Sequence, residues 1–175
     1  KLLGLYQARM GIIHCAENKL KLLRKIMETE KGNKIIIFNE RIEFTEKIKE
    51  LLEPEHELFI IHSKIPKNER LVQLAEFRNS NYGVLVTPRV IDEGIDVPEC
   101  DSVFITQPND NIDNLIQRMC RCNRIAKNKT RCDMYIWSSQ DKVQEILDYI
   151  GKNTIKNIHD SINLYNPLKN ITTNK

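Results

Sequence analysis

The sequence predicts an α/β fold in which a mostly parallel central sheet carries helices on both faces. Segments with helical periodicity alternate along the chain with short runs of apolar, often β-branched residues. Such alternation is typical of parallel strands joined by right-handed crossovers. The run Lys34 to Phe38, KIIIF, predicts a central strand covered on both faces. Five or six strands with flanking helices form the simplest assembly.

The elements follow one another in a regular order. Apolar positions at helical intervals between residues 5 and 30 predict one or two helices, with Asn18 capping the second and Gly32-Asn33 ending it. After the strand 34–38, the predicted elements are a helix near 40–52, a strand 58–61, a helix near 66–79, a strand 82–86, a short segment 89–93, a strand 102–106, a helix near 110–125, a strand 131–137 and a helix near 139–150.

Length and composition indicate one globular domain. The chain has 175 residues, of which 41% are hydrophobic and 29% charged, enough to bury one substantial core. We expect a helical lead-in over 1–30, the main α/β domain over 31–150, and a C-terminal helix or flexible tail over 151–175. Because the chain opens with Lys1, we also expect it to be a piece of a longer protein.

Cysteine usage and hydropathy narrow the cellular setting. The five cysteines are odd in number and irregularly spaced, unlike a secreted disulfide framework. No run is long enough for a membrane span, and no signal-peptide pattern opens the chain. These features predict an intracellular protein with no membrane contact. Cys120, Cys122 and Cys132 lack a fourth ligand at a familiar spacing, so we expect ordinary reduced thiols and no metal site.

Basic residues are unevenly distributed, although the net charge is only +3. Six of them fall between Arg118 and Arg131, whereas acids gather in 40–57 and 92–101, which hints at a basic face. On the predicted helix 110–125, Gln117, Arg121 and Arg124 lie within about 60° of one another, opposite the apolar stripe. Adjacent guanidiniums suit phosphate; a solvated basic face is the open alternative.

An acidic loop follows the strand that ends near residue 86. Asp92, Glu93 and Asp96 bracket Gly94. Gly94 permits a close backbone approach, and an Asp after a strand end can bind a ribose hydroxyl. The alternative reading is an ordinary surface turn. For Trp137, we expect a strand and its core and not a base-stacking platform.

Four segments together resemble the second RecA-like domain of superfamily 2 helicases. KIIIFNERIEF is similar to motif IV of that family, IHSKIPKNER to the histidine-containing segment after it, VLVTPRVIDEGIDVPECD to motif V, and LIQRMCRCNR to motif VI. The resemblance covers roughly residues 18 to 150. It implies a three-layer RecA-like fold of the P-loop NTPase type, and an ATP-dependent helicase or translocase that acts on DNA or RNA.

The resemblance also implies roles for single residues. Asp96, in the loop of Gly94, would contact the ATP ribose, Gln117 would lie near the triphosphate, and Arg121 and Arg124 would act as arginine fingers on the γ-phosphate. The nucleic-acid sugar-phosphate backbone would be contacted, without reading of its sequence, by a set of residues at strand ends: Asn39, His62, Ser63, Lys64, Thr87 and Arg89.

Absences and departures set limits on this resemblance. No G-x-x-x-x-G-K-[ST] loop and no D-E-x-D motif occurs, so the isolated chain should not hydrolyse ATP. We expect an N-terminal RecA-like domain of the same polypeptide to hold most of the ATP and Mg²⁺. Cys120 and Asn123 stand where motif VI has glycines, which suggests a divergent subgroup, with viral helicases one possibility. The alternatives are a non-catalytic helicase-like nucleic-acid-binding or regulatory module and a Rossmann-like enzyme, the latter disfavoured because no glycine-rich fingerprint follows the first strand.

Overall fold

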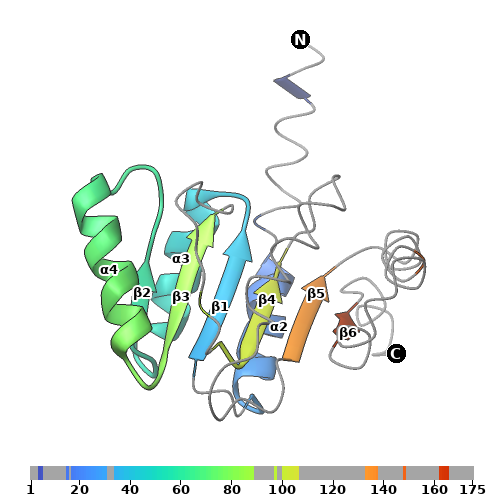
Figure 1. The fold of residues 1–175 in the computed structure, drawn as a ribbon. Helices are drawn as coiled ribbons and strands as arrows, with labels where there is room; N and C mark the ends of the chain where they lie inside the picture. The colour runs from blue at the N-terminus through green and yellow to red at the C-terminus, as the bar shows by residue number, and fades with distance from the viewer. Residues whose placement is uncertain are drawn as a thin grey trace, which may run out of the picture.

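The computed structural model describes residues 4–5, 15, 17–30, 34–88, 97, 100–106, 133–137, 148 and 162–165. They contain a six-stranded sheet in the order β2-β3-β1-β4-β5-β6, with every pair of neighbours parallel (Figure 1). The strands are β1 Lys34–Asn39, β2 Leu58–Ile60, β3 Gly83–Pro88, β4 Ser102–Ile105, β5 Asp133–Trp137 and β6 Ile162–Tyr165. The predicted α/β class with a parallel sheet is confirmed.

Strand β1 occupies the middle of the sheet, as its apolar run predicts. It pairs with β3 on one side and β4 on the other, so that Ile37 lies between Val86 and Phe104. All six of its residues are buried. Central strands that are covered on both faces favour apolar residues at successive positions, which explains why Ile35 to Phe38 do not alternate with polar residues.

Helices cover both faces of the sheet. α2 (Glu17–Met27) and α3 (Ile42–Leu52) lie on one face (Figure 1), where they share a core with alternate strand residues: Leu23, Ile26, Met27, Ile35, Ile37, Phe44, Ile48, Leu52, Val84, Val86, Phe104 and Trp137. α4 (Lys67–Asn79) covers the opposite face, where the Phe77 ring packs 5.4 Å from that of Phe59 on β2. Trp137 therefore belongs to a strand and the core, as expected.

Two predicted boundaries at the start of the chain were wrong. α2 begins at Glu17, so Asn18 lies inside the helix and does not cap it. The helix ends at Met27, before Gly32, because a turn stops it there: the Thr29 hydroxyl and the Glu30 amide both donate to the Ile26 carbonyl, at 3.0 and 2.8 Å. These bonds satisfy a carbonyl that the ending helix leaves without a partner.

Strand β3 starts one residue later than predicted and runs two residues further, to Pro88. Tyr82 is exposed, and Gly83 has a φ of +136°, a conformation that other residues rarely adopt. A Cβ on Gly83 would lie 2.7 Å from Cε2 of Phe59. Glycine therefore marks the point where the chain enters the sheet close to β2.

The prediction of a helix or tail after residue 150 was wrong for Ile162–Tyr165. These residues form β6, which pairs in parallel with β5 from Met134↔Ile162 to Trp137↔Tyr165. Ile162 and Leu164 fit a period of two as well as a weak helical pattern, and β5 offers an edge of hydrogen-bonding groups. Apart from this strand, the domain boundaries at 30 and 150 stay predictions.

Several predicted elements lie outside the described residues: the segment 89–93, the helix 110–125 and, except for Asp148, the helix 139–150. Among the helices that the structure describes, none has the length and apolar character needed to cross a bilayer.

Candidate nucleic-acid interface

Three segments with predicted nucleic-acid contacts meet at the end of the sheet where the parallel strands have their carboxyl ends. Because β2, β3 and β1 are adjacent and parallel, the residues that follow them emerge side by side. Thr87 pairs with Phe38, directly before Asn39. The amide of Ile61, directly before His62, donates to the Val86 carbonyl at 3.1 Å. The topology thus brings together residues that are up to 48 positions apart in sequence. They lie at the edge formed by the carboxyl ends of the strands, where α/β sheets place ligands.

Asn39 lies at the end of β1 with its side chain fully buried. Its Oδ1 accepts a hydrogen bond from the backbone amide of Arg41 at 3.0 Å, and its Nδ2 donates to the Thr45 hydroxyl at 3.0 Å. The first bond closes a turn between β1 and α3 of the kind that Asn side chains favour. In this conformation Asn39 shapes the loop from inside and presents no side-chain atom to solvent.

Two threonines line the same edge in neutral, buried settings. Thr87 at the end of β3 is fully buried. Thr106, directly after β4, donates to the Phe38 carbonyl through its amide at 3.0 Å and its hydroxyl at 3.2 Å. Buried polar groups cost free energy unless they are hydrogen-bonded, and the bonds of Thr106 meet that requirement. The inner part of the edge is therefore fixed and uncharged.

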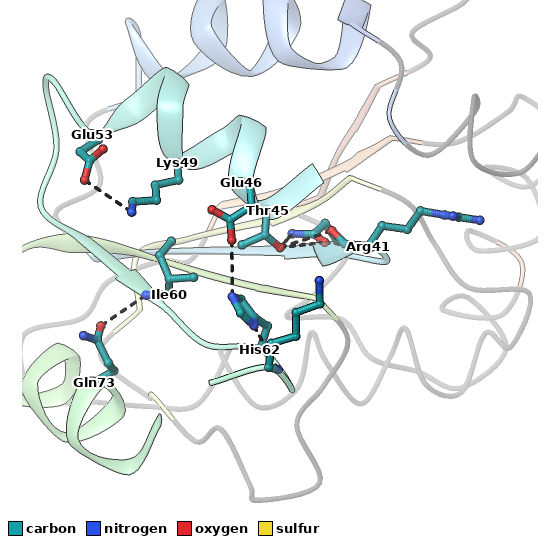
Figure 2. Close-up of polar contacts among 10 residues, drawn as sticks. Arg41, Thr45, Glu46, Lys49, Glu53, Ile60, His62 and Gln73 are labelled. Carbon is teal, nitrogen blue, oxygen red and sulfur yellow. Dashed lines mark hydrogen bonds and ion pairs between the residues drawn. The ribbon is translucent and has the colours of Figure 1, made fainter. Parts of the chain in front are cut away.

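His62 connects the loop after β2 to helix α3. Its Nδ1 accepts from the backbone amide of Lys64 at 3.3 Å, while its Nε2 lies 3.5 Å from Oε1 of Glu46 (Figure 2). An Nδ1 that accepts a hydrogen bond carries no proton, so the proton of a neutral imidazole sits on Nε2 and faces the carboxylate. The imidazole is nearly buried, at 8% exposure.

Ser63 and Lys64 are both exposed in this loop. The Ile65 amide donates to the His62 carbonyl at 3.0 Å, which closes a turn that projects both side chains from the edge. Arg41 is half-buried, and its side chain extends away from Thr45 in Figure 2. The hydroxyl of Ser63 and the cationic side chains of Lys64 and Arg41 thus form the outer part of this edge, where a phosphate backbone could reach them.

The other predicted site residues, Arg89, Gly94, Asp96, Gln117, Arg121 and Arg124, lie outside the described residues. Their roles stay predictions. The cysteine set 120, 122 and 132 also lies outside them. Among the residues that the structure does describe, no group of three His, Cys, Asp or Glu side chains could hold a metal ion.

Sequence reasoning missed three residues of this edge: Arg41, Thr45 and Glu46. The Asn39–Thr45 bond spans only six residues at a strand-to-helix junction, and an Asn followed by a Thr in the first helical turn is a local signal that could have been read. The Glu46–His62 contact could not be read in the same way, because it depends on how α3 crosses the sheet.

The parallel sheet, its two helical layers and its polar carboxyl edge define a three-layer RecA-like domain. The model of the helicase conserved C-terminal domain family matches residues 18–126, well over half of the chain. The chain belongs to this family, and the resemblance to the second RecA-like domain of superfamily 2 helicases is confirmed.

The relatives include proteins named as an RNA helicase and as a DNA translocase. Nucleolar RNA helicase 2 of Rattus norvegicus is 37% identical over 67 residues, which cover 38% of this chain and 9% of that protein. DNA 3'-5' translocase XPB2 of Sulfurisphaera tokodaii is 31% identical over 110 residues, 62% of this chain and 24% of that protein. The matched part of the chain thus spans a quarter or less of these relatives.

A solved structure carries the same fold. Domain 2 of the DEAD-box helicase Mss116p, bound to an RNA duplex, superposes with a TM-score of 0.61 at 22% identity, and the match covers 88% of this chain and 61% of that chain. At this level of identity the likeness supports the fold.

Proposed function

We propose that this chain is the C-terminal motor domain of an ATP-dependent nucleic-acid helicase or translocase and forms part of its nucleic-acid track. One observation carries the proposal: in a chain of the helicase C-terminal family, the segments at Asn39, His62–Lys64 and Thr87 converge on one sheet edge. The proposal places the protein inside the cell, where ATP and nucleic acid occur together.

The track is formed by charge and hydrogen bonding at the outer edge. Lys64 offers an ammonium and Ser63 a hydroxyl to phosphate oxygens, and both side chains are exposed. Such contacts position a strand without reading its bases, which suits an enzyme that moves along DNA or RNA. Asn39 and Thr87 contribute through the backbone that they hold, since their side chains are buried. Arg89 extends the track beyond β3.

The nucleotide site is shared with a preceding RecA-like domain of the same polypeptide. That domain holds most of the ATP and its Mg²⁺, and hydrolysis of ATP supplies the free energy of movement. On this chain, Asp96 contacts the ribose and Gly94 allows the backbone to approach the nucleotide closely. Gln117 lies near the triphosphate, and Arg121 and Arg124 bind the γ-phosphate across the cleft. Domain closure around the nucleotide then shifts the track residues relative to the other domain.

The track is tested by the salt dependence of binding in the full-length protein. Lys64→Ala should weaken binding of a single-stranded oligonucleotide and reduce the slope of log Kobs against log salt by about 0.7, because one phosphate contact is lost. Lys47→Ala removes the same charge from an exposed site on α3 and serves as the control. Equal slopes for both variants and the wild type would contradict the proposed role of Lys64.

A second candidate function rests on Cys120, which replaces the motif VI glycine. A side chain there can displace the arginines that follow and leave a helicase-like module that binds nucleic acid without catalysis. The two functions separate cleanly in one assay. Nucleic-acid binding with stimulated ATP turnover supports the motor, whereas binding without any turnover supports the module.

A further inference from the structure

Two consecutive residues of helix α3, Thr45 and Glu46, hold two different loops of the interface. Thr45 contacts Asn39, the last residue of β1, whose side chain holds the loop that follows. Glu46 contacts His62 in the loop after β2 (Figure 2). These loops are not neighbours, since β3 lies between β1 and β2 in the sheet. One helical segment therefore spans the width of three strands and touches both outer loops.

The Thr45 contact is buried and has more than one bond. Its Oγ1 accepts from Asn39 Nδ2 at 3.0 Å and lies 3.4 Å from both Asn39 Oδ1 and the Arg41 carbonyl, either of which can accept its single proton. Both side chains are fully buried. Asn39 Oδ1 also accepts from the backbone N–H of Arg41. The Thr45 hydroxyl therefore orients the Asn39 side-chain amide, which in turn shapes the loop.

The Glu46 contact reaches the exposed residues of the interface through one imidazole. Glu46 faces His62 Nε2, and His62 Nδ1 accepts from the Lys64 amide. The ring thus links the α3 carboxylate to the backbone that carries Ser63 and Lys64. Glu46 itself is about half exposed, with 52% of its side-chain surface open to solvent, so its replacement leaves no buried hole.

We infer that Thr45 and Glu46 are positioning residues, which set the geometry of the loops at Arg41 and at Ser63–Lys64 for binding of a nucleic-acid backbone. The inference rests on the proposed function. It adds that contacts made by α3 support the loops that bind nucleic acid. Neither residue needs to touch nucleic acid. Each acts through a partner, Asn39 or His62, that is itself buried.

Because Glu46 is charged, the direction in which its replacement changes nucleic-acid affinity tests the inference. A carboxylate beside a phosphate track repels it, so loss of the charge alone should tighten binding. Loss of positioning should weaken it. Glu46→Ala and Glu46→Gln remove the same charge, but only Gln keeps an oxygen that can accept from His62 Nε2. The two variants therefore separate positioning from electrostatics.

The experiment measures binding of labelled single-stranded oligouridylate, and of oligothymidylate of equal length, by the full-length protein. Glu46→Ala should raise Kd about five-fold, as expected for the loss of one polar contact, while Glu46→Gln stays within about two-fold of the wild type. Glu43→Ala, at another exposed acid of α3, is the control for charge. For Glu46→Ala, the nucleic-acid concentration that gives half-maximal ATPase activity should rise by the same factor as Kd. The maximal ATPase rate should change less.

Thr45→Val and Thr45→Ser repeat the test at the buried contact. Val removes the hydroxyl at nearly constant volume, whereas Ser restores it, so Ser should recover most of the binding that Val loses. Amide hydrogen exchange gives a readout independent of nucleic acid. The Arg41 amide should lose protection in Thr45→Val, and the Lys64 amide in Glu46→Ala but not in Glu46→Gln.

The outcomes distinguish this inference from the proposed function. Equal or tighter binding by Glu46→Ala, or the same behaviour of Ala and Gln, overturns the inference while the wild type still binds. Unchanged amide protection at Arg41 and Lys64 overturns it as well. If the wild type binds neither oligonucleotide, the proposed function fails first, and the positioning role fails with it.

Discussion

The ammonium of Lys34 lies 2.7 Å from the carbonyl oxygen of Arg78 and thereby joins the start of β1 to the last turn of α4. The same ammonium lies 5.6 Å from the centre of the Phe77 ring, and the Lys34 amide donates to Asp101 Oδ2 at 3.0 Å. A cation at a helix C-terminus interacts favourably with the helix dipole and with the carbonyls left unpaired there. Lys34 is buried, and these contacts offset the free energy that burial of its charge costs.

Substitution of Lys34 by Met should therefore destabilise the fold although Met fills similar space. The variant loses a charged hydrogen bond and a cation–π contact, and we expect the free energy of unfolding to fall by about 2 kcal/mol. Urea unfolding of the 175-residue chain measures this change. Lys47→Met, at an exposed lysine of α3, should change stability little. Equal effects at both sites would show that the Arg78 contact contributes nothing.

Gly83 should tolerate no side chain. Its φ of +136° is strained for alanine, and a Cβ there would lie 2.7 Å from Phe59 Cε2 and 3.3 Å from the Glu57 carbonyl oxygen. Gly83→Ala should cost about 2 kcal/mol or more and lower Tm by roughly 4–8 °C for a chain of this size. Gly4→Ala, where a Cβ meets nothing within 4 Å, is the control in thermal unfolding. Matching melting curves for both variants would contradict the strained backbone at Gly83.

Burial of Lys19 should make stability depend on pH in the alkaline range. Desolvation lowers the pKa of Lys19 from 10.5 to about 8, against an opposing effect of Cys15. Between those two values the unfolded chain binds more protons than the folded chain, so stability should rise as pH increases from 8 to 10.5. The gain relative to Lys19→Met, which has no titrating group, should reach up to roughly 3 kcal/mol.

Urea unfolding of the wild type and of Lys19→Met at pH 7.5, 9 and 10.5 checks this dependence. The difference in unfolding free energy between the two proteins should move in favour of the wild type as pH rises, and other titrating groups cancel in that difference. A constant difference across the range would mean that Lys19 keeps its ordinary pKa in the folded chain.

Much of the sheet was predictable because its strands are short apolar runs with clear ends. KIIIF predicted β1, and the strands β3, β4 and β5 were predicted to within two residues. β6 was missed because Ile162 and Leu164 fit two periodicities, and only the unpaired edge of β5 decides between them. The start of α2 was missed because Asn18 favours a cap position, whereas Glu17 also suits the first turn through its negative charge.

The candidate interface was predictable only in part. A family resemblance gave Asn39, His62, Ser63, Lys64 and Thr87, and the parallel strand order explains why they meet at one edge. The resemblance did not reveal that Asn39 and Thr87 are buried, since burial depends on packing of α3 and β1. Nor did it reveal Glu46, whose partner His62 lies sixteen positions away.

ATP turnover of the full-length protein with saturating single-stranded nucleic acid tests the proposed contribution of this chain to the nucleotide site of a motor. Arg121→Ala and Arg124→Ala should each lower the stimulated rate by about 10³-fold, as expected for loss of an arginine finger, while binding of oligouridylate or oligothymidylate remains. Arg24→Ala, an exposed arginine of α2, should keep the wild-type rate. Full turnover by folded Arg121→Ala and Arg124→Ala proteins would show that these arginines do not act on the γ-phosphate.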